Sequence, residues 1–551
     1  MQQVHEGVEA FRASWRSSVG ALLLILCLVA IGLGCIAVST GGHGWAAGAI
    51  VLAWVVWLLG RQFRGERTVL RIDARGLGGY WLKGHLVPWS EIADVRGESV
   101  QGHVQLVVQL LPGAASLRPT ARWLSGRKLE RRLPLGALTA QEARSSVEAA
   151  LRAFARHGGA NAAVAAQTHL DAHAAEGQFE ARLKAMTPMP WALYLMVVLN
   201  VGVWAMNVLM GMSAVAPLSE DLFRWGANSA WAVVHDGQYW RLLSAAFLHG
   251  GVMHLALNML GLWSAGLVLN RLYGNRQFLL IYLGSAIAGN ALSLHFSAQQ
   301  AVSVGASGAV FGVLGALIVA VLQHGHRLPA ATRKNLLTTQ AVFVVYSLVQ
   351  GFARTGIDNA AHVGGLVAGS VLAWILVERL DDEATAAKRL RHIALAAVLW
   401  VAGVGLLVAT TAQPTIDHER AFQVQARLQQ GVAALQQANL ALQKDAKANE
   451  SGQMSDALMI AAMRERHLPA IRKVRDALAS LSLPGADPRS SLLSDFQQLS
   501  ALMVEVMELE VRKAEGDATP ELAARIRTRS EEMKKVSERM KARTSKKSTA
   551  P

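Results

Sequence analysis

Cysteine is nearly absent from this sequence of 551 residues, and charged side chains are scarce. The only two cysteines, Cys27 and Cys35, lie in one apolar run. Eight residues of helix would separate them by about 12 Å along the axis. That is too far for a disulfide, so we interpret both as small buried hydrophobic residues. Charged residues make up 17% of the chain and hydrophobic ones 52%, which is too apolar a balance for an ordinary soluble protein.

Long apolar runs account for this composition. A secretory signal is the alternative interpretation of the first run, but that run is long, and Glu6 and Glu9 stand alongside Arg12 and Arg16 before it. We therefore predict a polytopic, all-α membrane protein, since roughly 17–22 apolar residues cross a hydrocarbon core of about 30 Å. The runs lie at 19–37, 45–60, 190–211, 252–270, 277–296, 304–323, 337–353, 360–379 and 392–411.

The net charge of +15 does not indicate a nucleic-acid partner, because many Lys and Arg residues lie in short loops between apolar runs. Loops 61–67, 271–276, 324–335 and 380–392 are basic, whereas the alternate loops carry few basic residues or none. Basic loops stay on the cytoplasmic side. We predict that residues 61–188 are cytoplasmic and that the C-terminal segment lies on the outer, periplasmic side of a bacterial inner membrane.

The remaining segments divide the chain further. Short alternating runs, followed by an amphipathic helix with capping-box spacing at Thr139 and Glu142, predict a small α+β domain. Helical spacing with breaks at 483–488 and 516–520 predicts three or four C-terminal helices in a bundle. The predicted order is an N-terminus 1–18, a two-span hairpin 19–60, an α+β domain 61–157, a linker 158–188, a membrane core 189–380, a loop and further span 381–411, a helical domain 412–545 and a disordered tail 546–551.

Polar side chains inside the apolar runs are candidates for function, because hydrocarbon does not tolerate them unpartnered. His254 and Asn258 are four residues apart and share one helix face. Ser307 begins a later run, and His362 lies one turn inside another. A single polar residue in a span is usually a packing residue. In the predicted orientation, however, all three spans carry theirs near the outer end, and independent packing residues would not converge on one depth.

This set of side chains fits nucleophilic catalysis. A serine hydroxyl needs an adjacent general base before it attacks a carbonyl, and a neutral imidazole suits that role. The resulting oxyanion needs donors, which an Asn amide, a second His and backbone N–H groups supply. Gly308-x-x-x-Gly312 and Gly365-x-x-x-Gly369 are small-residue pairs that let two helices approach closely.

These residues resemble the rhomboid intramembrane serine proteases in order and spacing, across about 190–380. The resemblance implies a six-helix rhomboid core with 392–411 as an extra seventh span. Residues 61–157 also resemble bacterial pleckstrin-homology-like (PH-like) domains, through Gly76 and Trp89-Ser-Glu-Ile92. The rhomboid motifs are Gly237-Gln-Tyr-Trp240-Arg241, His249-x4-His254-x3-Asn258, Gly305-Ala-Ser307-Gly308 and Ala361-His362-x-Gly-Gly365-x3-Gly369.

The resemblance implies a catalytic dyad in which Ser307 is the nucleophile and His362 the base. The Ser307 amide, His254 and Asn258 would form the oxyanion hole. Asn270 stands where family members often carry a Glu that supports the first loop, which puts the rigidity of that loop in question. The supporting residues that the resemblance implies are Phe311, which would pack against the imidazole, Gly305, Gly308, Gly365, Gly369, Trp240, Arg241 and His249.

A dyad implies a serine endopeptidase that acts on transmembrane protein substrates in the bilayer, with no cofactor and no metal. Asp358, four residues before His362, would have to reach the far imidazole nitrogen to act as a third member, so we assign it to the loop. One alternative is a catalytically silent rhomboid-like protein that binds membrane clients; another is a scaffold whose PH-like and C-terminal helical domains recruit partners. A third alternative is a transporter with a proton relay. The lack of acidic residues at mid-membrane argues against it.

Overall fold

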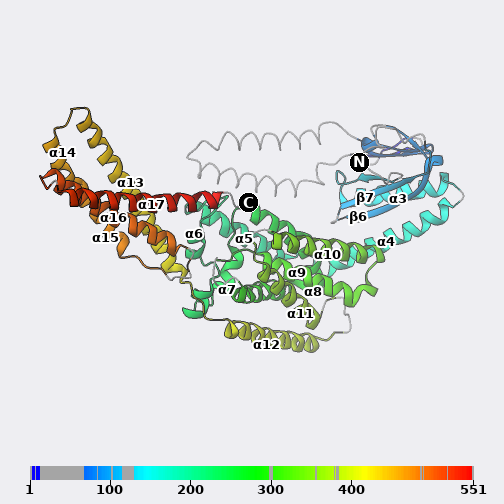
Figure 1. Cartoon of the computed structure of the whole chain (residues 1–551). Helices are drawn as coiled ribbons and strands as arrows, with labels where there is room; N and C mark the ends of the chain where they lie inside the picture. Colours follow the sequence, from blue (N-terminus) through cyan, green and yellow to red (C-terminus); the bar gives the residue numbers. More distant parts are fainter. Residues whose placement is uncertain are drawn as a thin grey trace. The chain divides into compact units, whose positions relative to one another are not determined.

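The computed structural model describes residues 3–5, 8–12, 68–82, 85–100, 103–114, 130–159, 161–296, 302–353, 356–377, 379, 384–483, 487, 489–517 and 519–548. Within these residues the fold is mainly helical, with two small sheets (Figure 1). One compact unit contains the described residues up to Asn228, from Tyr239 to 296 and from 302 to Thr411. The other contains Ser229–Gln238 and the described residues after Thr411. The predicted hairpin at 19–60, with both cysteines, lies outside the described residues.

Two antiparallel sheets and a helix form the N-terminal domain. Helix α3 (Ala140–His157) starts at a capping box in which the Glu142 amide donates to Thr139 Oγ1 and the Thr139 amide donates to Glu142 Oε2, confirming what the spacing predicts. The buried face of α3 contributes Leu151 and Phe154 to the same core as the strands. The first sheet has the strand order β1 (Gln3–His5), β2 (Val8–Arg12), β3 (Thr68–Asp73), β4 (Gly76–Gly78) and β5 (Val87–Pro88). The second sheet has the order β6 (Ile92–Val100), β7 (His103–Leu110) and β8 (Glu130–Pro134).

Strands β1 and β2 were not expected from the sequence, where residues 1–18 read as a plain N-terminal segment. Phe11 of β2 pairs with Leu70 of β3, and both side chains are buried. The chain therefore leaves this sheet after Arg12 and returns to it at Thr68. Residues on either side of the predicted hairpin thus belong to one sheet.

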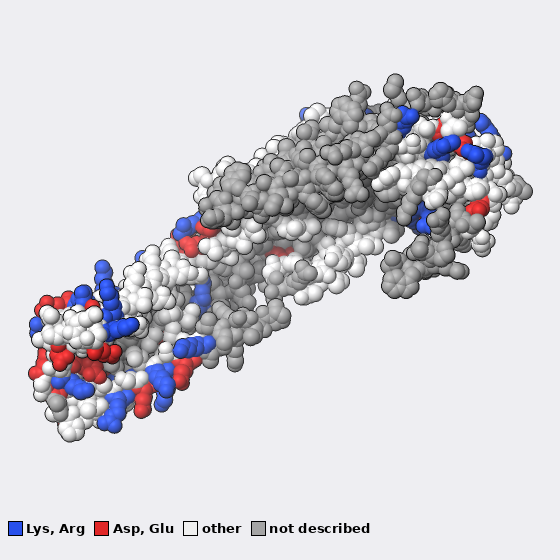
Figure 2. Space-filling view, turned by 90° about the horizontal axis from the view of Figure 1, so that it is seen from above, with Lys and Arg blue, Asp and Glu red and all other residues white. Residues whose placement is uncertain are grey.

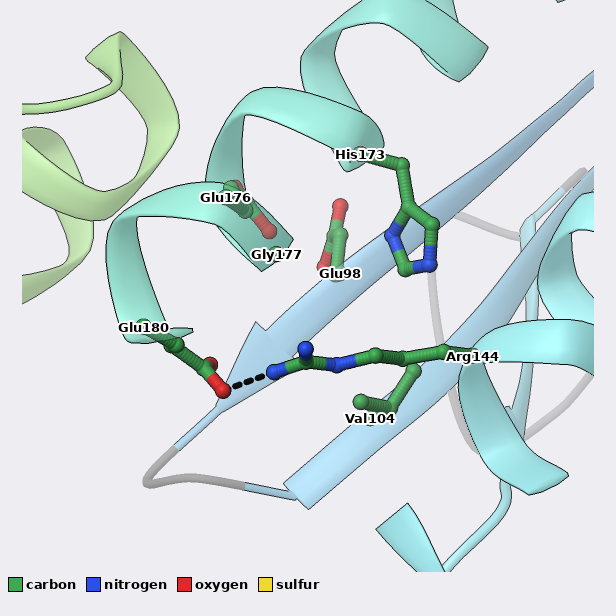
Figure 3. Close-up of a pocket in the computed structure, with 7 residues that line it drawn as sticks. All are labelled: Glu98, Val104, Arg144, His173, Glu176, Gly177 and Glu180. Carbon is green, nitrogen blue, oxygen red and sulfur yellow. Dashed lines mark hydrogen bonds and ion pairs between the residues drawn. The ribbon is translucent and has the colours of Figure 1, made fainter. Parts of the chain in front are cut away.

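Residues 162–186, within the predicted linker 158–188, form one continuous helix, α4 (Ala162–Met186). Alanine is the best helix former, and the segment is rich in it. Ala166 packs in the core of the N-terminal domain, whereas Leu183 packs with the apolar helices. Arg144 of α3 pairs with Glu180 of α4 beside a small pocket, which is also lined by Glu98, Val104, His173, Glu176 and Gly177 (Figure 3). This pocket contains none of the predicted site residues.

Six apolar helices of the described residues cover the seven predicted runs after residue 189. Helix α8 contains two of them, because the chain breaks its helical path at Gly274, where φ is 77° and ψ is 168°. With the family evidence given below, these helices make the chain a multi-pass membrane protein. The helices are α5 (Trp191–Leu209), α8 (Val252–Phe296), α9 (Ser307–His324), α10 (Ala330–Ala353), α11 (Asn359–Ile375) and α12 (Ala386–Thr410).

The connection from α5 to α8 is not a plain loop. The Arg241 side chain is buried, and its Nη1 donates to the carbonyl oxygens of Phe223 (2.7 Å) and Ala227 (3.0 Å). Its guanidinium lies over the rings of Phe223 and Trp240, at 4.2 and 4.8 Å from their centroids. Four short helical segments make up the connection: α6 (Ser219–Arg224), η5 (Trp231–His235), α7 (Arg241–Ser244) and η6 (Ala245–Phe247).

The C-terminal region, where the sequence predicts three or four helices, is helical over most of its described residues. Leu428, Ile471 and Val504 share one buried core from three helices. Acidic and basic side chains are interspersed over the outer surface of these helices (Figure 2, lower left). The elements are α13 (His418–Glu450), α14 (Asp456–Ala462), continued through η8 (Met463–His467) into α15 (Leu468–Ala479), α16 (Ser490–Ala514) and α17 (Pro520–Ser548). Helix α17 extends past the predicted start of the disordered tail, whose last three residues lie outside the described residues.

Lowering the pH is expected to destabilise the C-terminal helices. Burial lowers the pKa of His418, the Arg489 guanidinium acts in the same direction, and the carboxylates of Asp417 and Asp487 oppose both. The unfolded chain then binds a proton more readily than the folded one. The contribution of neutral His418 to the stability of the fold is therefore complete above the pKa of the unfolded chain, about 6.5, and is lost as the pH falls below it. Thermal unfolding of the full chain at about pH 7.5 and about pH 5.5 measures this loss. His418→Phe should reduce it; an equal loss in that variant would contradict the assignment.

Candidate active site

Ser307 is the first residue of α9 and follows a glycine with a special backbone conformation. Gly305 has φ 128°, a value that L side chains rarely adopt, and its amide donates to the Ala245 carbonyl at 2.9 Å. A Cβ atom at Gly305 would lie 2.7 Å from His254 Cε1 and 2.9 Å from His254 Nε2. Gly305 therefore does two things: it turns the chain into α9, and it leaves room for the His254 ring.

His254 and Asn258, on one face of α8, lie beside this turn. The Gly250 amide donates to His254 Nδ1 at 3.2 Å, so the neutral ring carries its proton on Nε2, the nitrogen nearest Gly305. The Asn258 side-chain amide donates to the His254 carbonyl at 3.0 Å, and its nitrogen would lie 3.8 Å from a Cβ atom at Gly305. Two polar N–H groups thus lie next to the chain that leads into Ser307.

His362 lies on α11 with its ring stacked on Phe311. The two ring centroids are 4.3 Å apart and the planes are 6° from parallel. Phe311 is one helical turn after Ser307 on α9. The His362 side chain is buried, and none of the described residues gives its Nδ1 a hydrogen-bond partner. Stacking on Phe311, rather than a carboxylate, fixes the plane of this imidazole.

Helices α9 and α11 touch through their backbones at two glycine pairs, which we call the glycine seam. A Cβ atom at Gly365 would lie 2.0 Å from the Gly308 carbonyl oxygen, and one at Gly369 would lie 2.1 Å from that of Gly312. Gly308 follows Ser307 directly, and Gly365 lies three residues after His362. The seam therefore brings the two helices together at the level of these two polar residues.

Asp358 is engaged away from the His362 ring. Its Oδ1 accepts from the Ala361 amide at 2.9 Å, which caps the N-terminus of α11. Its Oδ2 accepts from the hydroxyls of Ser293 and Ser303, the latter at 2.6 Å. Both oxygens of Asp358 are thus engaged in capping α11 and in contacts with serine hydroxyls, as expected for a residue assigned to the loop.

Asn270, which stands where family members often carry a Glu, has hydrogen-bond partners at the start of α5. Asn270 is fully buried, its Oδ1 accepts from the Leu193 amide at 3.1 Å, and its Nδ2 donates to Asn275 Oδ1 at 3.0 Å. Leu193 lies in the first turn of α5. Asn270 therefore supports the start of α5, where backbone N–H groups lack partners within the helix.

Three polar residues that the sequence did not single out tie that connection to the Ser307 turn. Asn228 and Ser303 exchange backbone hydrogen bonds at 2.9 and 3.0 Å, and Asn228 Nδ2 donates to the Asn290 carbonyl at 2.9 Å. Asn290 Nδ2 in turn donates to the Leu242 carbonyl at 2.8 Å. Asn290 stands inside the apolar run 277–296, so it is a polar residue in a span like His254 and Asn258.

The other predicted supporting residues occupy the same region. Trp240 is largely exposed beside the buried Arg241. The His249 ring is buried, with its centroid 5.3 Å from that of His254 in an edge-on arrangement. The structure thus gathers His254, Asn258 and Gly305 at the Ser307 turn, and it joins His362 to the same helix pair through Phe311 and the seam.

Known proteins share this region. The Rhomboid domain family model matches residues 236–379. The chain is 36% identical over 242 residues to Rhomboid protease GluP of Bacillus subtilis, which covers 44% of this chain and 45% of that protein. It is 37% identical over 163 residues to RHOMBOID-like protein 2 of Arabidopsis thaliana, covering 30% of this chain and 50% of that protein. The chain thus spans about half the length of these two relatives.

A third relative is covered more fully. The protein named "Putative rhomboid protease YdcA" of Bacillus subtilis is 32% identical over 148 residues, which are 27% of this chain and 72% of that protein. The family model also encloses the polar residues beside Gly305 and both helices of the glycine seam, α9 and α11. With most of one relative covered and the site inside the matched domain, the chain belongs to the rhomboid family.

Proposed function

We propose that this protein is an intramembrane serine protease, with Ser307 as nucleophile and His362 as general base. The proposal rests mainly on one observation. The His362 ring stacks on Phe311, which lies one turn after Ser307 on α9, and α9 and α11 are in backbone contact. A serine needs a neighbouring base to become nucleophilic, and a neutral imidazole held in place by its surroundings serves as one.

The reaction follows from these roles. Ser307 Oγ attacks the carbonyl carbon of the scissile peptide bond while His362 takes its proton. The tetrahedral intermediate collapses, the C–N bond breaks, and the imidazolium protonates the leaving amine. Water, deprotonated by His362, then attacks the ester carbonyl and releases Ser307. A substrate in or near its own transmembrane segment would reach this site from the bilayer.

The oxyanion is the second requirement, and three donors support it. The Ser307 amide lies in the first turn of α9, where backbone N–H groups have no partner within the helix and the helix dipole favours negative charge. His254 Nε2–H and the Asn258 amide lie beside Gly305. Donors preorganised around a developing negative charge stabilise the transition state more than the ground state.

We assign the site to the outer, periplasmic side of a bacterial inner membrane, in line with the basic loops on the other side. The N-terminal domain, with two sheets and a closing helix α3, supports the proposed PH-like fold. Both this domain and the C-terminal helices are then available to protein partners, on opposite sides of the membrane. The substrates are transmembrane proteins.

Cleavage by the wild-type protein is the experiment that tests the proposal. Purified full-length protein in liposomes is mixed with a single-span test substrate, and the products are weighed by mass spectrometry. We expect a pair of fragments that meet in or next to the substrate's apolar segment. Intact substrate bound to the protein would instead favour a catalytically silent client-binding protein.

Removing either side-chain oxyanion donor is expected to lower kcat. His254→Ala and Asn258→Ala should each lower it about 10²-fold, with smaller changes in KM, because the donor acts on charge that develops in the transition state. Ser264→Ala is the matched control on α8, since the Ser264 hydroxyl bonds its own helix at the Gly261 carbonyl. A rise in KM with unchanged kcat in both variants would place these residues in substrate binding instead.

A further inference from the structure

A piece of the connection between α5 and α8 belongs to the same compact unit as the C-terminal helices. That piece is Ser229–Gln238, and α13 begins in the same unit at His418. Ser229 Oγ lies 3.1 Å from His418 Nδ1, and the two residues are only 2% and 5% exposed. A buried polar contact of this kind is costly to break, because each group would lose its partner without gaining water.

Ser229 Oγ has a second partner in its own segment. The Ala232 amide donates to it at 3.4 Å, which leaves the hydroxyl one lone pair and its proton for the contact with His418 Nδ1. Burial favours the neutral imidazole that can accept it. The charged groups that face His418 are Asp417, Asp487 and Arg489, and Asp487 and Arg489 pair with each other at 2.8 Å.

Ser229 is one peptide bond from the residue that pairs with the Ser307 turn. Asn228 exchanges two backbone hydrogen bonds with Ser303, four residues before Ser307. The Ser303 hydroxyl donates to Asp358, and Asp358 caps the helix that carries His362. A restraint on Ser229 therefore restrains Asn228, and through Asn228 the segment that leads into the nucleophile.

We propose that His418 is a positioning residue for the protease, and that its hydrogen bond to Ser229 holds the 303–307 segment in its reactive conformation. The inference rests on the proposed function of Ser307 and deepens it. It gives the C-terminal helices a part in setting the rate of the reaction rather than in capturing substrate. Because the contact acts on the nucleophile's segment, it should affect kcat and leave KM nearly unchanged.

The test uses full-length variants in liposomes with the single-span test substrate. His418→Phe keeps a ring and removes both nitrogens, and Ser229→Ala removes the hydroxyl. Each should lower kcat about 5–10-fold, the size of one lost buried hydrogen bond. The double variant should be no slower than either single one, because both remove the same contact. His418→Asn, whose amide can stand where Nδ1 stood, should restore most of the rate.

His467→Phe is the matched control. His467 is equally buried in the C-terminal helices, and its Nε2 lies 2.7 Å from Asp445 Oδ2, with no part in the Ser229 contact. This variant should lower thermal stability and leave kcat within about twofold of wild type. An equal drop in kcat would mean that the His418 effect is general destabilisation. Additive losses at His418 and Ser229, or a change in KM alone, would also overturn the proposal.

Hydrogen exchange separates failure of this inference from failure of the proposed function. The amides of Asn228 and Ser303 bond each other, so their exchange reports on the restraint without any catalysis. Their exchange should quicken in His418→Phe and Ser229→Ala and stay slow in His467→Phe. Unchanged exchange would overturn the positioning role even in an inactive protein. Quickened exchange in the two variants, together with a wild type that cleaves nothing, would leave the coupling standing and overturn the protease.

Discussion

Replacing Ser307 or His362 with alanine is expected to lower kcat by about 10⁴-fold or more, because each removes half of a unit that acts together. Without Ser307 there is no oxygen to form the ester. Without His362 the hydroxyl keeps its proton at neutral pH and is a weak nucleophile. The double variant should be no slower than either single variant, since the second change removes nothing that still works. Cleavage rates of the single-span test substrate in liposomes measure this.

Two control variants separate chemistry from packing in that experiment. Ser264→Ala removes a hydroxyl that only bonds its own helix. His295→Ala removes a ring whose Nε2 lies 2.8 Å from the Leu407 carbonyl of α12. Both should stay within about tenfold of the wild-type rate. If Ser307→Ala or His362→Ala also stayed within about tenfold, the dyad would be wrong.

Adding one methyl group at the glycine seam is expected to have the second-largest effect. In Gly365→Ala the new Cβ would meet the Gly308 carbonyl oxygen at 2.0 Å, the carbonyl carbon at 2.7 Å and the Cα at 3.0 Å. All three are backbone atoms, so the helices themselves must separate. A displacement of about 1 Å between reacting groups costs on the order of 10²-fold in rate. We expect that loss in kcat, together with a lower unfolding temperature.

Gly202→Ala is the matched control for the seam. Gly202 lies on the apolar helix α5, and a Cβ atom there would meet nothing within 4 Å. This variant should keep its activity and be slightly more stable, because alanine is the better helix former. Wild-type rate and unfolding temperature in Gly365→Ala would contradict the close approach of α9 and α11.

The membrane helices and the candidate site residues could be predicted from the sequence, because the bilayer imposes simple requirements. An apolar run must have a minimum length, and a polar residue inside it needs a reason. That rule indicates His254, Asn258, Ser307 and His362, and it applies equally to Asn290.

The features that the sequence did not predict depend on contacts between distant segments. The pairing of β2 with β3 joins residues on either side of the predicted hairpin. The partners of Asn270 lie on α5, and nothing near position 270 in the sequence identifies them. Helix α4 shows little hydrophobic periodicity, because only four of its residues are buried: Ala162, Ala166, Phe179 and Leu183. No local pattern joins Ser229 to His418.

The position of a covalent adduct tests the central claim most directly. A fluorophosphonate probe phosphonylates an activated serine and releases fluoride, so it marks the nucleophile without any substrate. Full-length protein in liposomes is labelled, digested and sequenced by mass spectrometry. The account predicts one modified peptide, with the adduct on Ser307, and no labelling in His362→Ala. An adduct on any other serine, or labelling that persists without His362, would contradict it.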